Sequence, residues 1–190
     1  MWLFWQFLLV LSFFHVSEFT LAWLLTGDVS RRSWLFSTHY CIAMSFSTAE
    51  FFLEHLLFPE WKTSGTAKGI SQVGLVLVCL GELMRKTGIV TAGSSFTHDI
   101  KTTSRTHAGV LVTKGVYKYV RHPGYLGWFV WSIATQVLLV NPLSTVLFAI
   151  VSWRFFATRI PYEEHLLVDI FGRAYEEYRR RTRTWIPFIR

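Results

Sequence analysis

The chain has 190 residues, of which 52% are hydrophobic, 17% aromatic and only 16% charged. Soluble domains usually carry about 25% charged residues. The composition therefore excludes a disordered chain, a collagen-like chain and a nucleic-acid-binding tail, and it indicates an integral membrane protein. The net charge of +7 fits this class, because the basic residues gather at the ends of apolar runs. Cys41 and Cys79 both lie in apolar runs and predict neither a disulfide framework nor a zinc site.

Three apolar runs occupy the first half of the chain, over residues 2–25, 34–58 and 70–84. A membrane-spanning helix needs about 20 mostly apolar residues, so we predict one span in each run. The first run has no basic start and no small-residue cleavage site after it. We therefore interpret it as a span and not as a signal peptide.

Five polar side chains interrupt these runs: His15, Glu18, Glu50, Glu54 and Glu82. Such groups normally face the interior of a helical bundle and pair with one another. We expect a structural polar network. A catalytic role or a place at the border of a functional site is the alternative.

A polar segment over residues 85–121 follows, with seven Lys or Arg residues, and it predicts an aqueous region. Two short apolar arms, 125–140 and 143–156, flank the turn signal Asn141-Pro142 and predict a helical hairpin over 122–158. The three-to-four spacing of apolar residues after Pro161 predicts an amphipathic helix over 160–183.

These elements predict an all-α, polytopic membrane protein with about five transmembrane helices. We divide it into three N-terminal spans, residues 1–84, and a second region, residues 85–190, that holds the aqueous segment, the hairpin and the amphipathic helix. The positive-inside rule places the segment 85–121 in the cytosol and the N-terminus outside.

The densest cluster of polar side chains beside an apolar run is the motif Arg121-His122-Pro123-Gly124-Tyr125. It lies where the aqueous segment meets the hairpin. A two-arm hairpin returns its second arm to the same membrane face. Arg159 and Glu163 should therefore lie close to His122 and Tyr125. Taken alone, Arg159 is better explained as an anchor at the membrane interface.

With these motifs, the sequence resembles the isoprenylcysteine carboxyl methyltransferases. The resemblance covers roughly residues 10–190. The elements that carry it are Gly115-Val116-Tyr117, Arg121 to Gly127, Arg159, Glu163-Glu164, Phe171-Gly172, Tyr175 to Tyr178, His15 to Glu18, Phe51 to Glu54 and Thr91 to Phe96.

The resemblance implies a reaction in which a prenylated C-terminal cysteine carboxylate takes the methyl group of S-adenosylmethionine (SAM). A C-terminal carboxyl has a pKa of about 3.5 and is already ionised at neutral pH, so no general base is required. No metal is called for. The implied partners are farnesylated or geranylgeranylated client proteins and membrane lipid, and no nucleic acid.

The resemblance also implies site residues. Arg159 should hold the substrate carboxylate, because a guanidinium binds a carboxylate in a bidentate way. The expected cofactor contacts are Lys101, His107, Leu111, Val112, Tyr117, His122, Pro123, Gly124, Tyr125 and Glu163. A helical wheel favours Glu163 over Glu164 as the inward-facing carboxylate. Arg154 is expected to be a second anion holder or a partner for a buried glutamate.

Other functions remain open from the sequence. A sterol-type reductase would use NADPH, and a phospholipid or amine methyltransferase would use SAM. A membrane scaffold or transporter would bind no nucleotide-type ligand. The resemblance implies the endoplasmic reticulum, with the active site facing the cytosol.

Overall fold

A computed structural model of the chain describes residues 1–27, 34–96 and 110–190. In these ranges every regular element is a helix, apart from one isolated parallel bridge between Val120 and Arg183. The prediction of an all-helical fold is confirmed. The elements in chain order are α1 (Trp2–Thr26), α2 (Thr38–Leu57), α3 (Pro59–Thr63), α4 (Gly65–Ala92), η2 (Gly93–Ser95), η4 (Gly115–Lys118), α5 (Pro123–Leu139), α6 (Pro142–Phe171) and α7 (Arg173–Arg181).

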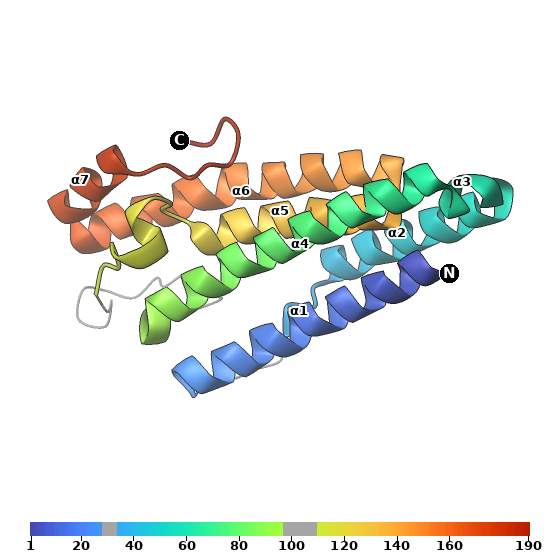
Figure 1. Cartoon of the computed structure of the whole chain (residues 1–190). Coiled ribbons are helices and arrows are strands. Elements are labelled where there is room, and N and C mark those ends of the chain that lie inside the picture. Colours follow the sequence, from blue (N-terminus) through green and yellow to red (C-terminus); the bar gives the residue numbers. More distant parts are fainter. Residues whose placement is uncertain (28–33, 97–109) are drawn as a thin grey trace.

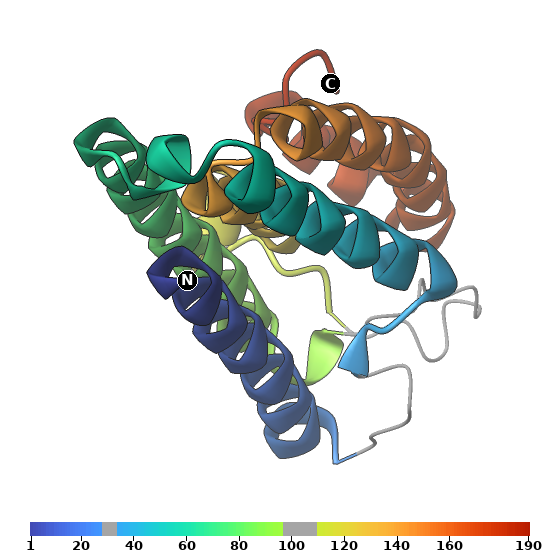
Figure 2. The same ribbon diagram turned by 90° about the vertical axis from the view of Figure 1, so that its right-hand side faces the viewer.

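The long helices run roughly along one direction (Figure 1). The view turned by 90° shows α1 and α4 on one side of the bundle and α6 on the other (Figure 2). Among the described helices, Trp2–Leu25 and Pro142–Phe171 are long and apolar enough to cross a membrane by length and composition. The number of five spans stays a prediction.

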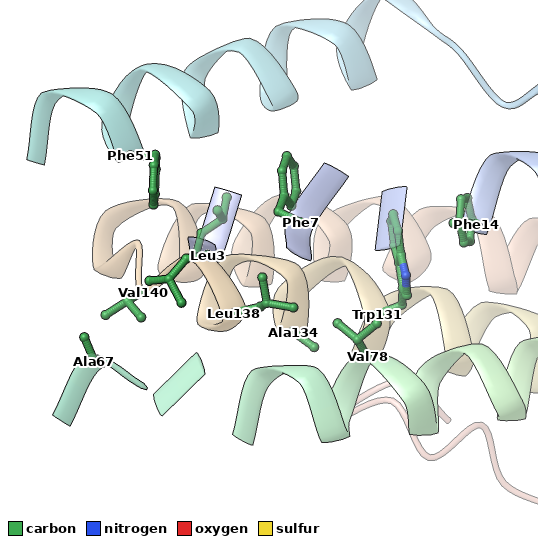
Figure 3. Packing of buried hydrophobic residues seen from close by; sticks show 11 residues of the cluster. Leu3, Phe7, Phe14, Phe51, Ala67, Val78, Trp131, Ala134, Leu138 and Val140 are labelled. Carbon is green, nitrogen blue, oxygen red and sulfur yellow. The ribbon is translucent and has the colours of Figure 1, made fainter. Parts of the chain in front are cut away.

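Aromatic and aliphatic side chains of α1, α2, α4 and α5 form the core (Figure 3). Phe14 and Trp131 are fully buried, and their rings stack with centroids 4.0 Å apart. On the outer side of α1, Trp5, Leu9 and Phe13 are at least 60% exposed. This combination of a packed aromatic core and an apolar outer surface is what an integral membrane helix requires, because lipid and not water covers that surface.

Helix α4 is longer than the predicted span 70–84, since it continues without a break to Ala92. The charged residues that directly follow the apolar run are neutralised inside the bundle. Arg85 donates from Nε and Nη2 to the two carboxylate oxygens of Glu18, over 2.9 and 2.6 Å, and Lys86 also pairs with Glu18. Because these charges are paired, they do not force the helix to end where the apolar run ends.

The other polar groups of the apolar runs also have partners, as predicted. His15 bonds the carbonyl of Trp34 and the hydroxyl of Tyr40, and Lys62 forms an ion pair of 2.6 Å with Glu54. Glu50 accepts from the backbone N–H groups of Leu143 and Ser144 at the start of α6. Glu82 lies 3.3 Å from Lys86.

The predicted hairpin is present, with α5 ending at Leu139 and α6 beginning at Pro142. Its second arm extends far beyond residue 156. Helix α6 passes through Pro161 and ends at Phe171, where Gly172 takes a φ of 58°. The prediction of one separate helix over 160–183 is therefore wrong. Proline removes a single backbone donor, and the helix on either side of Pro161 is long enough to continue across it.

Glycines bring α4 very close to α5. A Cβ added at Gly74 would lie 2.3 Å from the backbone nitrogen of Leu138, and one at Gly81 would lie 2.8 Å from the carbonyl oxygen of Gly127. Any side chain at these positions has to push two backbones apart. We conclude that the α4–α5 contact sets the distance between α4 and the start of α5, where the motif lies.

Replacing Gly74 with alanine should lower the free energy of unfolding by about 1–3 kcal/mol, because the added methyl group overpacks a backbone contact. Thermal unfolding of the purified protein in detergent measures this. The matched control is Gly69→Ala on the same helix, where nothing lies within 4 Å of the added Cβ. Alanine there should be neutral or stabilising. Equal effects of the two substitutions would contradict the close contact.

Candidate active site

The motif Arg121 to Tyr125 lies at the first turn of α5. His122 is the residue before the helix, and Pro123 takes the first helical position, where a missing N–H costs nothing. Arg85 of α4 donates from Nη1 to the carbonyl oxygen of Gly124 over 3.0 Å. Arg85, which is itself held by Glu18, therefore fixes the backbone of this turn from the neighbouring helix α4.

A chain of hydrogen bonds joins the motif to α6. Nε of Arg159 donates to the hydroxyl oxygen of Tyr125 over 2.9 Å, and that hydroxyl donates to Oε2 of Glu163 over 2.5 Å. The hairpin thus brings Arg159 and Glu163 to Tyr125, as predicted. The Arg159 guanidinium also lies over the rings of Tyr125 and Phe155, 5.5 and 5.7 Å from their centroids. Its orientation is therefore fixed from two sides.

Glu164 has a second set of partners. Its Oε1 accepts from Nε of Arg121 over 2.7 Å and lies 3.1 Å from Nε2 of His122. Arg121 also donates from Nη1 to the carbonyl oxygens of Arg179 and Thr182. Glu164 is 3% exposed. The helical wheel was wrong to favour Glu163 alone, because both carboxylates face inward and bind different neighbours.

A cavity opens between the motif, residues 110–112, η4 and one face of α6. Its lining includes eight of the ten predicted cofactor contacts: Leu111, Val112, Tyr117, His122, Pro123, Gly124, Tyr125 and Glu163. Lys101 and His107 lie outside the described residues. Arg159 does not line this cavity and reaches it through Tyr125.

Three further tyrosines belong to this region, and two of them were not predicted. Tyr178 donates to the carbonyl oxygen of Tyr117 over 2.7 Å. Tyr175 is 1% exposed, and its hydroxyl has no hydrogen-bond partner among the described residues. Burial raises the pKa of Tyr117 to about 12, so this part of the wall is uncharged at neutral pH.

The structure adds residues that the sequence did not single out as site residues: Arg85, Arg121, Glu164, Tyr175 and Tyr178. Arg121 is the first residue of the motif, and Glu164 directly follows Glu163, so the sequence did carry a signal for both. Nothing in the chain pattern linked Arg85 to Gly124, which lies 39 positions away.

No buried glutamate that the structure describes pairs with Arg154, and the other expectation for it, a second anion holder, is not tested by its position. It is exposed, and it forms no ion pair with a carboxylate in the ranges that the structure describes. It lies five positions before Arg159 on α6.

Comparison with known proteins agrees with this arrangement. The sequence model of the isoprenylcysteine carboxyl methyltransferase (ICMT) family matches residues 74–169. Protein-S-isoprenylcysteine O-methyltransferase B from Arabidopsis thaliana is 48% identical over 97% of this chain and 92% of its own length. The Mus musculus protein-S-isoprenylcysteine O-methyltransferase is 42% identical over 95% of this chain and 63% of its own length.

A solved structure of the eukaryotic intramembrane Ras methyltransferase ICMT superposes with a TM-score of 0.92. It is 41% identical, and the match covers 98% of this chain and 67% of that one. The helical bundle and the site at its end therefore define an integral membrane methyltransferase. The chain belongs to the isoprenylcysteine carboxyl methyltransferase family.

Proposed function

We propose that this protein transfers a methyl group from SAM to the C-terminal carboxylate of a prenylated cysteine, which gives a methyl ester. The observation that carries the proposal is the hydrogen-bonded chain from Arg159 through Tyr125 to Glu163. It connects Arg159, a cation that suits the substrate carboxylate, to Glu163. The side chain of Glu163 lies on the wall of a cavity that suits a nucleoside-type ligand.

Arg159 would bind the substrate carboxylate. A guanidinium stays protonated at any relevant pH and presents a planar set of donors that matches a carboxylate. The rings of Tyr125 and Phe155 restrict how the guanidinium can turn. The bound carboxylate would therefore meet a cation in one orientation, which lowers the entropic cost of aligning two reactants.

The cavity residues fit a molecule such as SAM, which has an apolar base and several polar groups. Leu111, Val112 and Tyr117 would contact the adenosine part. His122, Tyr125 and Glu163 would contact the polar parts, with Glu163 accepting from ribose hydroxyls or the ammonium group. When bound, SAM supplies an electrophilic methyl group. Roles for Lys101 and His107 are proposed from the family resemblance alone.

The protein's own task is to orient the two reactants and to keep water away from the carboxylate, because the nucleophile is already ionised. Aromatic rings surround Tyr125 on α5 and α6. His122 stacks on Tyr125 with ring centroids 5.4 Å apart, and Phe156 lies 5.1 Å from Tyr125 on another side. These rings would limit the access of water to the hydroxyl that joins Arg159 to Glu163.

The proposal extends to access and location. A farnesyl or geranylgeranyl group is too apolar to travel through water, so the substrate would enter sideways from the bilayer, while SAM would enter from the cytosol. The endoplasmic reticulum and a cytosol-facing site are proposed from the family resemblance and the distribution of basic residues. If bulky substitutions between the helices beside Phe155 left the KM for the prenyl substrate unchanged, sideways entry would be contradicted.

The test of the function is methyl transfer from labelled SAM to N-acetyl-S-farnesylcysteine by the purified full chain in lipid vesicles. We expect a base-labile ester with the free carboxylate and no product with the corresponding carboxamide. Label on phosphatidylethanolamine in place of the cysteine derivative would favour a phospholipid methyltransferase. Thermal stabilisation by NADPH and not by SAM would favour a reductase.

Replacing Tyr125 with phenylalanine should lower kcat/KM by about ten-fold or more, because a shared hydroxyl that bridges two charged side chains is worth about 1.5–3 kcal/mol. The aromatic ring remains, so the packing of His122 and Phe156 should stay intact. Steady-state methyl transfer measures the effect. Tyr119→Phe is the matched control, since Tyr119 is 66% exposed. An unchanged Tyr125→Phe enzyme would show that the bridge is not used.

A further inference from the structure

A second concave surface lies on the opposite face of α6 from the cofactor cavity. Positions 163, 166, 167 and 170 of α6 line the cofactor cavity, whereas 161, 164, 165 and 168 line the second surface. The other wall consists of the end of α7 and the C-terminal residues, and the volume is about 990 Å³. We call this surface the C-terminal groove.

Arginine dominates the charge of the C-terminal groove. Five arginines line it, against the two carboxylate side chains Glu164 and Glu176: Arg121, Arg179, Arg180, Arg183 and Arg190. Glu164 is already paired with Arg121. Arg180 and Arg183 are exposed and form no ion pair with a carboxylate in the described part of the chain. The groove therefore presents positive charge that the protein itself does not neutralise.

The C-terminal residues form a built wall. The tail turns back from α7 along α6 (Figure 1), and Ile186 and Ile189 are buried against Phe156 and Ile160. Trp153 donates from Nε1 to the carbonyl oxygen of Pro187 over 2.7 Å. The tail is thus held at a defined place on α6.

This wall presents two aromatic rings to the outside. Trp185 is 63% exposed and Phe188 is 96% exposed, and both have a φ of 62°, in the left-handed region. Both the left-handed φ and the exposure of a phenylalanine ring to water cost free energy. Aromatic rings beside basic residues are typical of the membrane–water interface, where the ring enters the lipid and the cation meets the headgroups.

We propose that the C-terminal groove binds the headgroup of an anionic phospholipid. The arginines would hold the phosphate and carboxylate oxygens by charge-assisted hydrogen bonds. The exposed Trp185 and Phe188 at the rim would insert beside the acyl chains. Anionic phospholipid is favoured over an acidic protein segment because the chain is an integral membrane protein and because the rim is apolar where a soluble partner would meet water.

The test is native mass spectrometry of the full chain in detergent, with dioleoyl phosphatidylserine or dioleoyl phosphatidylcholine added at equal concentration. The wild type should retain one phosphatidylserine in clear preference to phosphatidylcholine. The double variant Arg180→Gln/Arg183→Gln should bind phosphatidylserine about thirty-fold more weakly, since each arginine near an anionic surface contributes about a five-fold gain.

The matched control is Arg173→Gln/Arg181→Gln. It removes the same two charges from α7 at exposed positions that do not line the groove. It should weaken binding by less than about three-fold, because only residues in contact with the headgroup matter in a built site. Equal losses in the two double variants would overturn the groove and leave only a diffuse attraction of charge.

Three further outcomes would overturn the proposal. Equal retention of the two lipids by the wild type would show that the groove does not select an anion, and this result does not depend on any variant. Displacement of phosphatidylserine by millimolar inorganic phosphate would assign the arginines to a free anion and not to a lipid. Self-association that is lost in the groove variant, without lipid selectivity, would assign the surface to a second copy of the chain.

Discussion

Replacing Arg159 with alanine should lower kcat/KM for N-acetyl-S-farnesylcysteine by about a hundred-fold or more, because the loss of one partner of a desolvated charge pair costs about 2–5 kcal/mol. The binding of SAM should change little, since Arg159 does not line the cofactor cavity. Steady-state methyl transfer and a SAM-dependent thermal shift, measured on the same preparation, separate these two effects.

Two variants make this prediction specific. Arg159→Lys keeps the charge and loses the planar set of donors, so it should recover only part of the activity. Arg154→Ala removes an exposed arginine from the same helix and should leave activity within about two-fold, as expected for a surface substitution. If Arg154→Ala were as damaging as Arg159→Ala, the effect would be the loss of an anchor on α6 and not of a carboxylate-binding group.

Replacing Lys62 with methionine should lower the free energy of unfolding by about 3–5 kcal/mol, because it leaves a partly buried carboxylate and several buried carbonyls unpaired. Nζ of Lys62 donates to the carbonyl oxygens of Leu139 and Val140 and to Oδ1 of Asn141, over 2.8–2.9 Å. It also pairs with Glu54. One ammonium group therefore holds the turn between α5 and α6.

Thermal unfolding in detergent measures this loss, with Lys68→Met as the control. Lys68 lies six positions further along the chain and is exposed, so its loss should change stability by less than about 0.5 kcal/mol. A shifted hairpin in Lys62→Met should also reduce activity, because the hairpin brings Arg159 to Tyr125. A fully stable Lys62→Met protein would show that the turn is held by packing alone.

The sequence was sufficient to predict the hairpin and what it brings together. Two apolar arms around Asn141-Pro142 leave few ways to place the second arm, so the meeting of Arg159 and Glu163 with Tyr125 followed from chain geometry. The structural pairing of the polar groups was predictable for the same physical reason, since a charge inside an apolar bundle needs a partner.

The particular partners were not predictable. The sequence places no constraint on Lys62 meeting Leu139, which lies 77 positions away, or on Arg85 meeting Glu18, which lies 67 positions away. The first contact depends on how α3 meets the end of α5, and the second on how α4 packs against α1, and the chain pattern specifies neither arrangement. The end of α4 was misjudged for the same reason, because hydropathy counts a paired charge as if it met lipid. The division into residues 1–84 and 85–190 stays a prediction.

The uninterrupted course of α6 through Pro161 has a consequence for how the two reactants are aligned. Arg159 and Glu163 are four positions apart on one helix, so about 6 Å along a single axis separates their backbones. The proposed anchors of substrate and methyl donor therefore cannot drift relative to each other while the helix is intact. Insertion of one residue between them would turn Glu163 by about 100° around that axis, away from the hydroxyl of Tyr125. The regular pitch of α6 therefore fixes both the distance and the angle between the two proposed anchors.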